Sequence, residues 1–321
     1  MGTLKKMTKL FLLLVITLVS CSEDNLQEIE SDKVSYNSIA EFFMENGVKT
    51  QEFTVQADLG GTITGEQGTE ITFPENAFKK DDGTIVSGPI DIKVKEIFKA
   101  SDMILSDKPT NALDIFGGET FLLSEGETAV LAEQNGETLS LIPGKSYSVK
   151  VPSAGGADPE MRPFNGTFDN DGNLVWNIAS ERDQAGGFGM NYVAPGSYIY
   201  DVFQIGWTNC DKFYAYPGQK TTNHVNLTDS PNLDETVVYA VFKENNLPAV
   251  VKLTTEYASG VVSYTNSLPV GLEITFIGIT IKDNQQYLAK EDKTIAVDEE
   301  FVMNFNPVST DEIISVLEGL N

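Results

Sequence analysis

Apolar and polar positions alternate along much of this chain. Four segments between residues 51 and 153 place an apolar side chain at every second position, which is typical of half-buried strands. These segments are residues 62–64, 70–73, 90–94 and 147–151. Turn-forming residues lie between them at Asp81-Asp82-Gly83, Glu125-Gly126 and Asn135-Gly136. The pattern predicts a β-sandwich over residues 51–153.

A second alternating region follows a stretch that is rich in glycine, aspartate and asparagine. That stretch covers residues 154–190, and within it residues 164–178 are predicted to form a hairpin around the turn at 169–173. Further strands are predicted at residues 198–205, 236–242, 249–254, 273–281 and 301–305. We therefore expect a loop-rich connector at 154–190 and a second β-rich domain at 191–308.

A short helix is predicted before the strands, at residues 38–47. Ser38 and Glu41 have the spacing of a capping box, and Gly47 is a suitable stop. We expect the apolar side of this helix to pack on the first β module.

A second helix is predicted at the C-terminus, at residues 309–321. Ser309 and Glu312 have the spacing of another capping box, and Ile313 and Leu317 follow at helical spacing. We expect this amphipathic helix to dock on its own domain, which is commoner than a helix that binds a partner.

The first twenty residues have the three parts of an export signal. Three lysines precede an apolar run at residues 10–19, and the small residue Ser20 precedes Cys21. A ten-residue run is about 15 Å long as a helix, at ~1.5 Å per residue, and a hydrocarbon core is about 30 Å thick. The run is therefore too short to span a bilayer.

The stretch Leu18-Val19-Ser20-Cys21 resembles the lipobox of bacterial lipoproteins. The resemblance implies a signal peptide at residues 1–20, cleavage between Ser20 and Cys21, and acyl chains such as palmitate on Cys21. Residues 21–50 would then hold the lipid anchor, an acidic linker and the first helix. An ordinary secretory signal followed by a chance cysteine is the alternative.

Acidic residues follow the cysteine, from Ser22-Glu23-Asp24 to Asp32. Such a segment resembles the surface-export tether of lipoproteins in Bacteroidota, and a solvated flexible linker explains it equally well. Ser22, rather than an aspartate, follows Cys21 and favours the outer membrane. The expected localisation is the cell envelope, lipid-anchored at the outer membrane, with surface exposure if the tether reading holds.

Charge narrows the range of partners. Loss of residues 1–20 removes three lysines and no acids, which changes the net charge from −25 to −28. Such acidity disfavours nucleic acid, whose phosphates need lysine and arginine. It also disfavours electrostatic binding to anionic lipid, so membrane contact is expected through the acyl chains on Cys21 alone.

Several motifs in the first β region resemble ZU5-like domains. The matching segments are residues 60–63, 69–78, 88–90, 95–96, 102–105 and 141–147. A further segment, residues 206–213, resembles a motif of uncharacterised Bacteroidota surface lipoproteins. The resemblance implies a mainly β fold with a ZU5-like β-sandwich, a second β-rich module and short terminal helices. It implies protein–protein contacts, and the self-cleavage motif His-Phe-Ser of some relatives is missing because Val225 follows His224.

Trp176 and Trp207 are the two tryptophans and the candidate ligand-contact residues. On a β-sandwich they would form a sugar-stacking platform if exposed, but strand-like surroundings favour burial in the core. Trp207, beside Gly206 and near Cys210, suggests packing around a turn.

The remaining candidates for chemistry are weak. Residues 169–173 offer oxygen ligands for calcium, but the sequence lacks the glycine and glutamate that an EF-hand loop requires, and a β-turn explains the same residues. Because Cys21 is committed to lipid, Cys210 is unpaired and expected to be buried. We predict no metal site and no cofactor. A catalytic carboxylate pair is not indicated at any position, although many acids are present.

These observations predict a non-enzymatic lipoprotein that acts as a protein-interaction or envelope-structural module. The expected partner is an envelope protein or a glycan, in addition to the membrane. The alternative is a carbohydrate-binding or carbohydrate-processing accessory lipoprotein. Exposure of Trp176 or Trp207 beside a groove of acids would favour the alternative, and burial of both would count against it.

Overall fold

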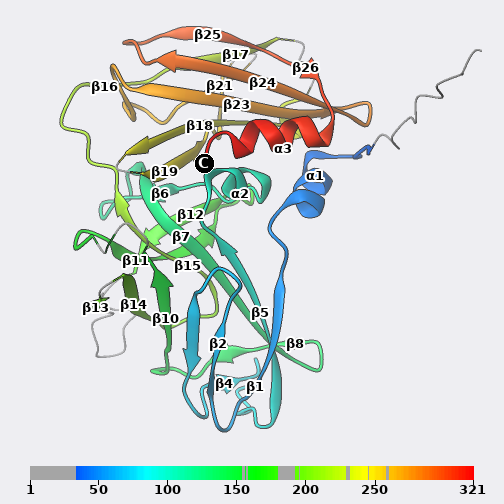
Figure 1. The fold of residues 1–321 in the computed structure, drawn as a ribbon, viewed down its shortest axis with the longest axis vertical. Coiled ribbons are helices and arrows are strands. Elements are labelled where there is room, and N and C mark those ends of the chain that lie inside the picture. Colours follow the sequence, from blue (N-terminus) through cyan, green and yellow to red (C-terminus); the bar gives the residue numbers. More distant parts are fainter. Residues whose placement is uncertain are drawn as a thin grey trace, which may run out of the picture. The chain divides into compact units, whose positions relative to one another are not determined.

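The protein is mainly β, as predicted. The computed structural model describes residues 34–153, 156, 158–179, 192–194, 196–228, 232–244, 246–257 and 260–321. The predicted signal peptide, Cys21 and the acidic linker lie outside the described residues. Figure 1 shows the strands as two groups, with short helices between them.

An eight-stranded sheet forms one layer of the first sandwich. Its longest strand is β7, which pairs with β5 along one side and with β15 along the other. Along the sheet the strands are β1 (Gln51–Gln56), β5 (Pro89–Ile97), β7 (Glu119–Gln134), β15 (Gly206–Phe213), β11 (Arg162–Phe168), β12 (Leu174–Ile178) and β6 (Asn111–Leu113), with β8 (Glu137–Thr138) added to β7.

A five-stranded sheet forms the second layer. Its strands, in order, are β13 (Tyr192–Ala194), β14 (Ser197–Val202), β10 (Tyr147–Pro152), β3 (Glu70–Phe73) and β2 (Gly61–Thr64). The short strands β4 (Phe78–Lys79) and β9 (Ser140–Leu141) pair with each other as a separate two-stranded sheet. Alternate residues of several of these strands are buried in a shared apolar core, among them Ile92 and Val94 of β5 and Val149 and Val151 of β10. The β-sandwich that the alternation predicts is therefore present in the structure.

The first sandwich extends further along the chain than the sequence suggests. Strands β13, β14 and β15 were expected in the second domain, but they pair with strands of the first sandwich. The predicted hairpin at 164–178 is confirmed, with Phe164 opposite Ile178, and it belongs to the eight-stranded sheet rather than to a connector. Strand β7 pairs with β5 along one edge, and β15 satisfies the backbone hydrogen-bonding groups of its other edge.

The turn expected at Glu125-Gly126 is wrong, because β7 runs through it. Gly126 has a φ of +136°, which a glycine adopts without strain. The pairing with β15 shifts register at this point, between Asn209 and Asp211, so the two residues form a bulge within the strand. The other turn at Asn135-Gly136 is confirmed: both residues have positive φ and join β7 to β8.

The second sandwich is built from residues after Phe213. One sheet has the order β19 (Leu247–Lys252), β18 (Thr236–Glu244), β23 (Glu273–Lys282), β24 (Gln285–Thr294) and β26 (Asn306–Pro307). The other has the order β20 (Thr255–Tyr257), β21 (Gly260–Val262), β17 (His224–Thr228) and β25 (Glu300–Asn304), and β16 (Lys220–Thr221) pairs with β22 (Leu268–Pro269). Phe121 and Leu123 from the start of β7 enter this second core, so one strand contributes to both sandwiches.

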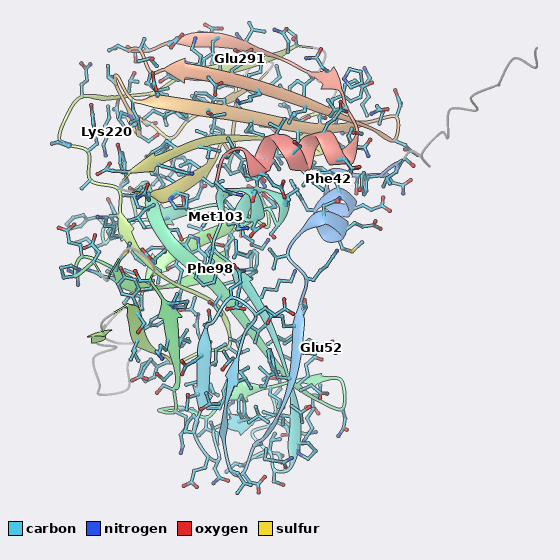
Figure 2. The ribbon with its side chains drawn as sticks, in the orientation of Figure 1. Phe42, Glu52, Phe98, Met103, Lys220 and Glu291 are labelled. Atoms are coloured by element: carbon cyan, nitrogen blue, oxygen red, sulfur yellow. The ribbon has the colours of Figure 1, made fainter. Side chains whose placement is uncertain are left out.

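The helices α1 (Ile39–Asn46), α2 (Ala100–Leu105) and α3 (Thr310–Glu318) cover the outer face of the β18–β23 sheet, and the 3₁₀ turn η1 (Leu233–Glu235) precedes β18. Phe42 of α1 and Met103 of α2, both labelled in Figure 2, are fully buried in this layer. The expectation that α1 packs on the first module is therefore wrong in the main, since most of its neighbours come from the second sandwich.

The predicted caps are present at both terminal helices. Ser38 accepts a hydrogen bond from the amide of Glu41, but the Glu41 carboxylate binds the amide of Asn37 instead of closing the box. Ser309 and Glu312 form the complete capping box. Ile313 and Leu317 are buried, which confirms that the C-terminal helix docks on its own domain.

Candidate functional site

The two tryptophans lie on the same face of the eight-stranded sheet, separated by one strand. Trp207 of β15 is beside Ala129 of β7, and Trp176 of β12 is beside Gly166 of β11. Trp176 is fully buried, and its indole N–H donates to the carbonyl of Pro109 at 2.9 Å. The core prediction for Trp176 is confirmed, and its ring offers no surface to a ligand.

Trp207 differs from Trp176 because it is only half-buried. It lies within β15, so the expectation of packing around a turn is wrong. Its ring borders a groove of about 300 Å³, with an apolar floor that includes Ala129 and Leu131. The groove lies on the outer face of the sheet, where Lys95 of β5 is opposite Ala129, and Ala129 is opposite Trp207. Three neighbouring strands thus present a cation, a small residue and an aromatic ring side by side.

Lysines give the groove its charge. Lys93 forms an ion pair with Glu133 at 2.7 Å. Lys95 has no ion pair within the described residues, and burial together with the nearby Lys49 lowers the pKa of its ammonium. Lys108 places its ammonium 5.7 Å from the ring centroids of both Trp207 and Phe168, which is within the range of a cation–π contact.

The next row of side chains on the same face contains polar residues that are buried. Glu127 of β7 lies between Ile97 of β5 and Asn209 of β15. Glu127 is fully buried, and within the described residues neither carboxylate oxygen accepts a hydrogen bond. Burial and the neighbouring Asp211 raise the pKa of Glu127 well above its ordinary value, and Lys108 opposes this only in part. Burial therefore favours the neutral acid of Glu127 over its carboxylate.

Asp211 is the second buried acid of this cluster, and it is well supplied with donors. It accepts hydrogen bonds from the Ser124 hydroxyl at 2.9 Å, from the amide of Glu125 at 3.1 Å and from the Asn209 amide group at 2.6 Å. Burial raises the pKa of Asp211, and these donors oppose that shift. The β7–β15 register thus brings together a carboxyl pair that nothing in the sequence identified.

This pair has no route to a substrate in the structure. Glu127, Asn209 and Asp211 have no exposed surface, whereas a glycosidase pair must border the scissile bond. Cys210, on the opposite face, is buried as predicted, and burial with the nearby Asp211 raises the pKa of its thiol. A thiol with a raised pKa is a poor nucleophile.

Residues 169–173 form a turn, which is the alternative that the sequence offers to a calcium site. The Asp169 carboxylate accepts hydrogen bonds from the amides of Asp171 and Asn173, both at 2.9 Å. Within the described ranges no group of three potential ligands is arranged for a metal. His224 starts the strand β17 and packs against the ring of Tyr257, with 4.3 Å between centroids.

Comparison of the chain with protein-family models found no match, and comparison with curated proteins found no relative. The likeness to ZU5-like domains and to Bacteroidota lipoproteins therefore stays a prediction. Among the residues that the structure describes, no helix is long and apolar enough to cross a membrane. Cys21 and Ser20 lie outside those residues.

Sequence reasoning found Trp207 but missed its neighbours in the groove. The segment Lys93-Val94-Lys95 alternates, with Val94 in the core and both lysines on the outer face, so its outward lysines were visible in principle. Nothing local marks Ala129 or Leu131 as their neighbours, because that depends on the register between β5 and β7.

Proposed function

We propose that this chain is an exported, lipid-anchored envelope protein that acts as a non-enzymatic interaction module. The groove beside Trp207 is its contact site. The observation that carries this proposal is the half-buried Trp207 ring above an apolar floor on a rigid sheet. Aromatic residues with apolar surroundings are enriched where proteins bind partners.

The burial of the acids supports a binding role over catalysis. Glu127 and Asp211 are the closest approach to a catalytic pair, and both are enclosed. The groove next to them is lined by Thr50, two lysines, a tryptophan and small or aliphatic residues. Within the described residues the Thr50 hydroxyl makes no hydrogen bond to a base, as an activated nucleophile would.

The carbohydrate alternative receives less support. It requires an exposed tryptophan beside acids, but Trp176 is buried and Trp207 has Lys93, Lys95 and Lys108 around it. A purely structural role in the envelope differs from the proposed one in the number of partners rather than in the site.

Lipid anchoring is tested by replacing Cys21 with serine. We expect the variant to lose acylation and to leave the membrane fraction, because the acyl chains supply the membrane affinity. Detergent phase partition of wild type and variant measures this. A Cys21→Ser protein that still partitions fully with membranes would refute the anchor.

The groove is tested by filling it. Ala129→Phe places a ring in the slot without removing a charge, and Val302→Phe on β25 is a matched control on a surface of the second sandwich. Each tagged protein is purified from gently solubilised membranes, and partners are quantified by mass spectrometry. We expect a stoichiometric partner with wild type and the control, and its loss with Ala129→Phe. Equal recovery from all three proteins would contradict the proposal.

A further inference from the structure

The two lysines that line the groove, Lys93 and Lys95, differ in the charge of their neighbours. Lys93 has the carboxylate of Glu133, and it also lies near Glu52 and Asp91, which raise the pKa of its ammonium. Lys95, two residues along the same strand, has another cation, Lys49, as its charged neighbour. A half-buried ammonium beside a like charge is unfavourable, and its position is notable in a chain with a net charge of −25.

An anion at Lys95 would relieve this imbalance. The groove beside the ammonium is apolar, with Ala129 and Leu131 as floor and the Trp207 ring as one wall. The site therefore combines three features: a cation with no ion pair in the part of the chain that the structure describes, an apolar slot and an aromatic face. An occupant that satisfies all three carries a carboxylate next to an apolar or aromatic group.

We propose that the groove receives an acidic segment of a partner protein, with an aromatic or large aliphatic side chain in the slot and a neighbouring carboxylate on Lys95. This inference rests on the proposed interaction function and assigns the chemistry of the partner. The ring of the incoming residue packs against Trp207, and the carboxylate takes the place that Glu133 occupies at Lys93.

The shape of the groove favours a protein segment over a free small molecule. Small-molecule sites enclose most of their ligand, whereas this groove lies on the surface of a sheet and has a volume of about 300 Å³. That is room for one large side chain whose backbone stays outside. An anchor residue in a pocket, surrounded by polar contacts, is the usual core of a protein interface.

The distribution of charge on the chain also explains why an acidic partner would bind at this groove rather than elsewhere. An acidic partner is repelled by most of this chain, because the net charge is −25, and is attracted only where lysines gather. Opposite charge at the site with like charge elsewhere directs a partner to one position.

The test uses three fluorescein-labelled peptides and the full-length lipoprotein in non-ionic detergent micelles. The peptides are Glu-Asp-Phe-Asp-Glu, its neutral counterpart Gln-Asn-Phe-Asn-Gln, and Glu-Asp-Ser-Asp-Glu, which lacks the anchor. Fluorescence anisotropy gives each dissociation constant at low and high salt. We expect the first peptide to bind most tightly, and its affinity to fall with salt. The neutral peptide controls for partition into micelles.

Two variants locate the binding. Lys95→Gln removes the ammonium and is expected to weaken the acidic aromatic peptide about fivefold, the equivalent of ~1 kcal/mol, while leaving the neutral peptide unchanged. Lys95→Arg is expected to restore most of the affinity. Ala129→Phe should abolish binding of the anchor. The control Lys243→Gln, at an exposed position of β18, should have no effect.

The outcomes separate this inference from the function it rests on. If the acidic and neutral peptides bind equally, or if Lys95→Gln and Lys243→Gln behave alike, the acidic-segment assignment is wrong. A membrane partner that still depends on Ala129 would then keep the interaction function. Loss of both the peptide preference and the Ala129-dependent partner would reject both.

Discussion

Two neighbouring rows of side chains on one face of the eight-stranded sheet differ in their exposure to solvent. The row Lys95, Ala129 and Trp207 is open and forms the groove, whereas the row Ile97, Glu127 and Asn209 is buried. The residues are only two positions apart along each strand. The difference lies in what covers them, since α2 and the segment that follows it pack over the second row. The same alternation thus yields an open groove or an enclosed polar cluster, depending on whether α2, the helix that follows β5 in the chain, packs over the row.

The largest effect is expected from exchanging the two tryptophans for alanine one at a time. Trp176→Ala removes a fully buried ring and its hydrogen bond to Pro109, so it should lower the free energy of unfolding by about 3–5 kcal/mol. Trp207→Ala removes a half-buried ring and should cost roughly half as much. Denaturant unfolding of both variants gives the values. Equal losses would mean that the burial of Trp176 and of Trp207 contributes equally to stability.

Gly166 lies between the two rings and allows them to approach. A Cβ at this position would come within 2.6 Å of the Trp207 Cβ and 2.8 Å of a Leu174 methyl group. Gly166→Ala should therefore destabilise the fold by about 1–3 kcal/mol through overpacking and shift the tryptophan fluorescence. Gly61→Ala, whose nearest new contact is 3.5 Å from Val55, is the control. Two variants of similar stability would show that the spacing at Gly166 is not restrictive.

Glu127→Gln tests whether the buried Glu127 makes the free energy of unfolding depend on pH. Burial raises the folded-state pKa of Glu127 above its unfolded value, so its contribution to stability is complete at acid pH and is lost as the pH rises toward the folded pKa. The glutamine variant has no proton to lose, so its advantage over wild type should grow by up to about 1.4 kcal/mol per pH unit above pH ~5.

Unfolding curves of wild type and Glu127→Gln between pH 5 and 8 provide the measurement, and Glu133→Gln, near the C-terminal end of β7, is the comparison. Glu133 is paired with Lys93 near the surface, so its replacement removes an ion pair that contributes little to stability. Parallel profiles for wild type and Glu127→Gln would show that Glu127 is ionised in the folded protein.

Local sequence was sufficient for much of the fold. Alternation located strands such as β3 and β23, and the cap at Ser309 located α3. Strand β24 was missed because several of its residues are charged and its buried positions are few. The continuation of β7 through Gly126 was missed because a glutamate–glycine pair is a turn signal, which pairing with β15 overrides.

The candidate site was predictable only in part. Composition singled out Trp207 and Trp176, and strand context favoured the core for Trp176. The groove itself depends on the registers of β5, β7 and β15, and the Glu127–Asp211 pair depends on the bulge at Gly126. Long-range registers of this kind are set by tertiary pairing rather than by local pattern.

A photocrosslinker at Thr50 would show whether the groove beside Trp207 binds an acidic partner. Thr50 is exposed at the edge of the groove, so a photoreactive phenylalanine analogue there leaves the slot free. In cells that make the full-length protein, we predict one discrete adduct whose crosslinked peptide is acidic with an apolar residue, and which disappears with Lys95→Glu. No adduct, or an adduct that Lys95→Glu leaves unchanged, would contradict the account.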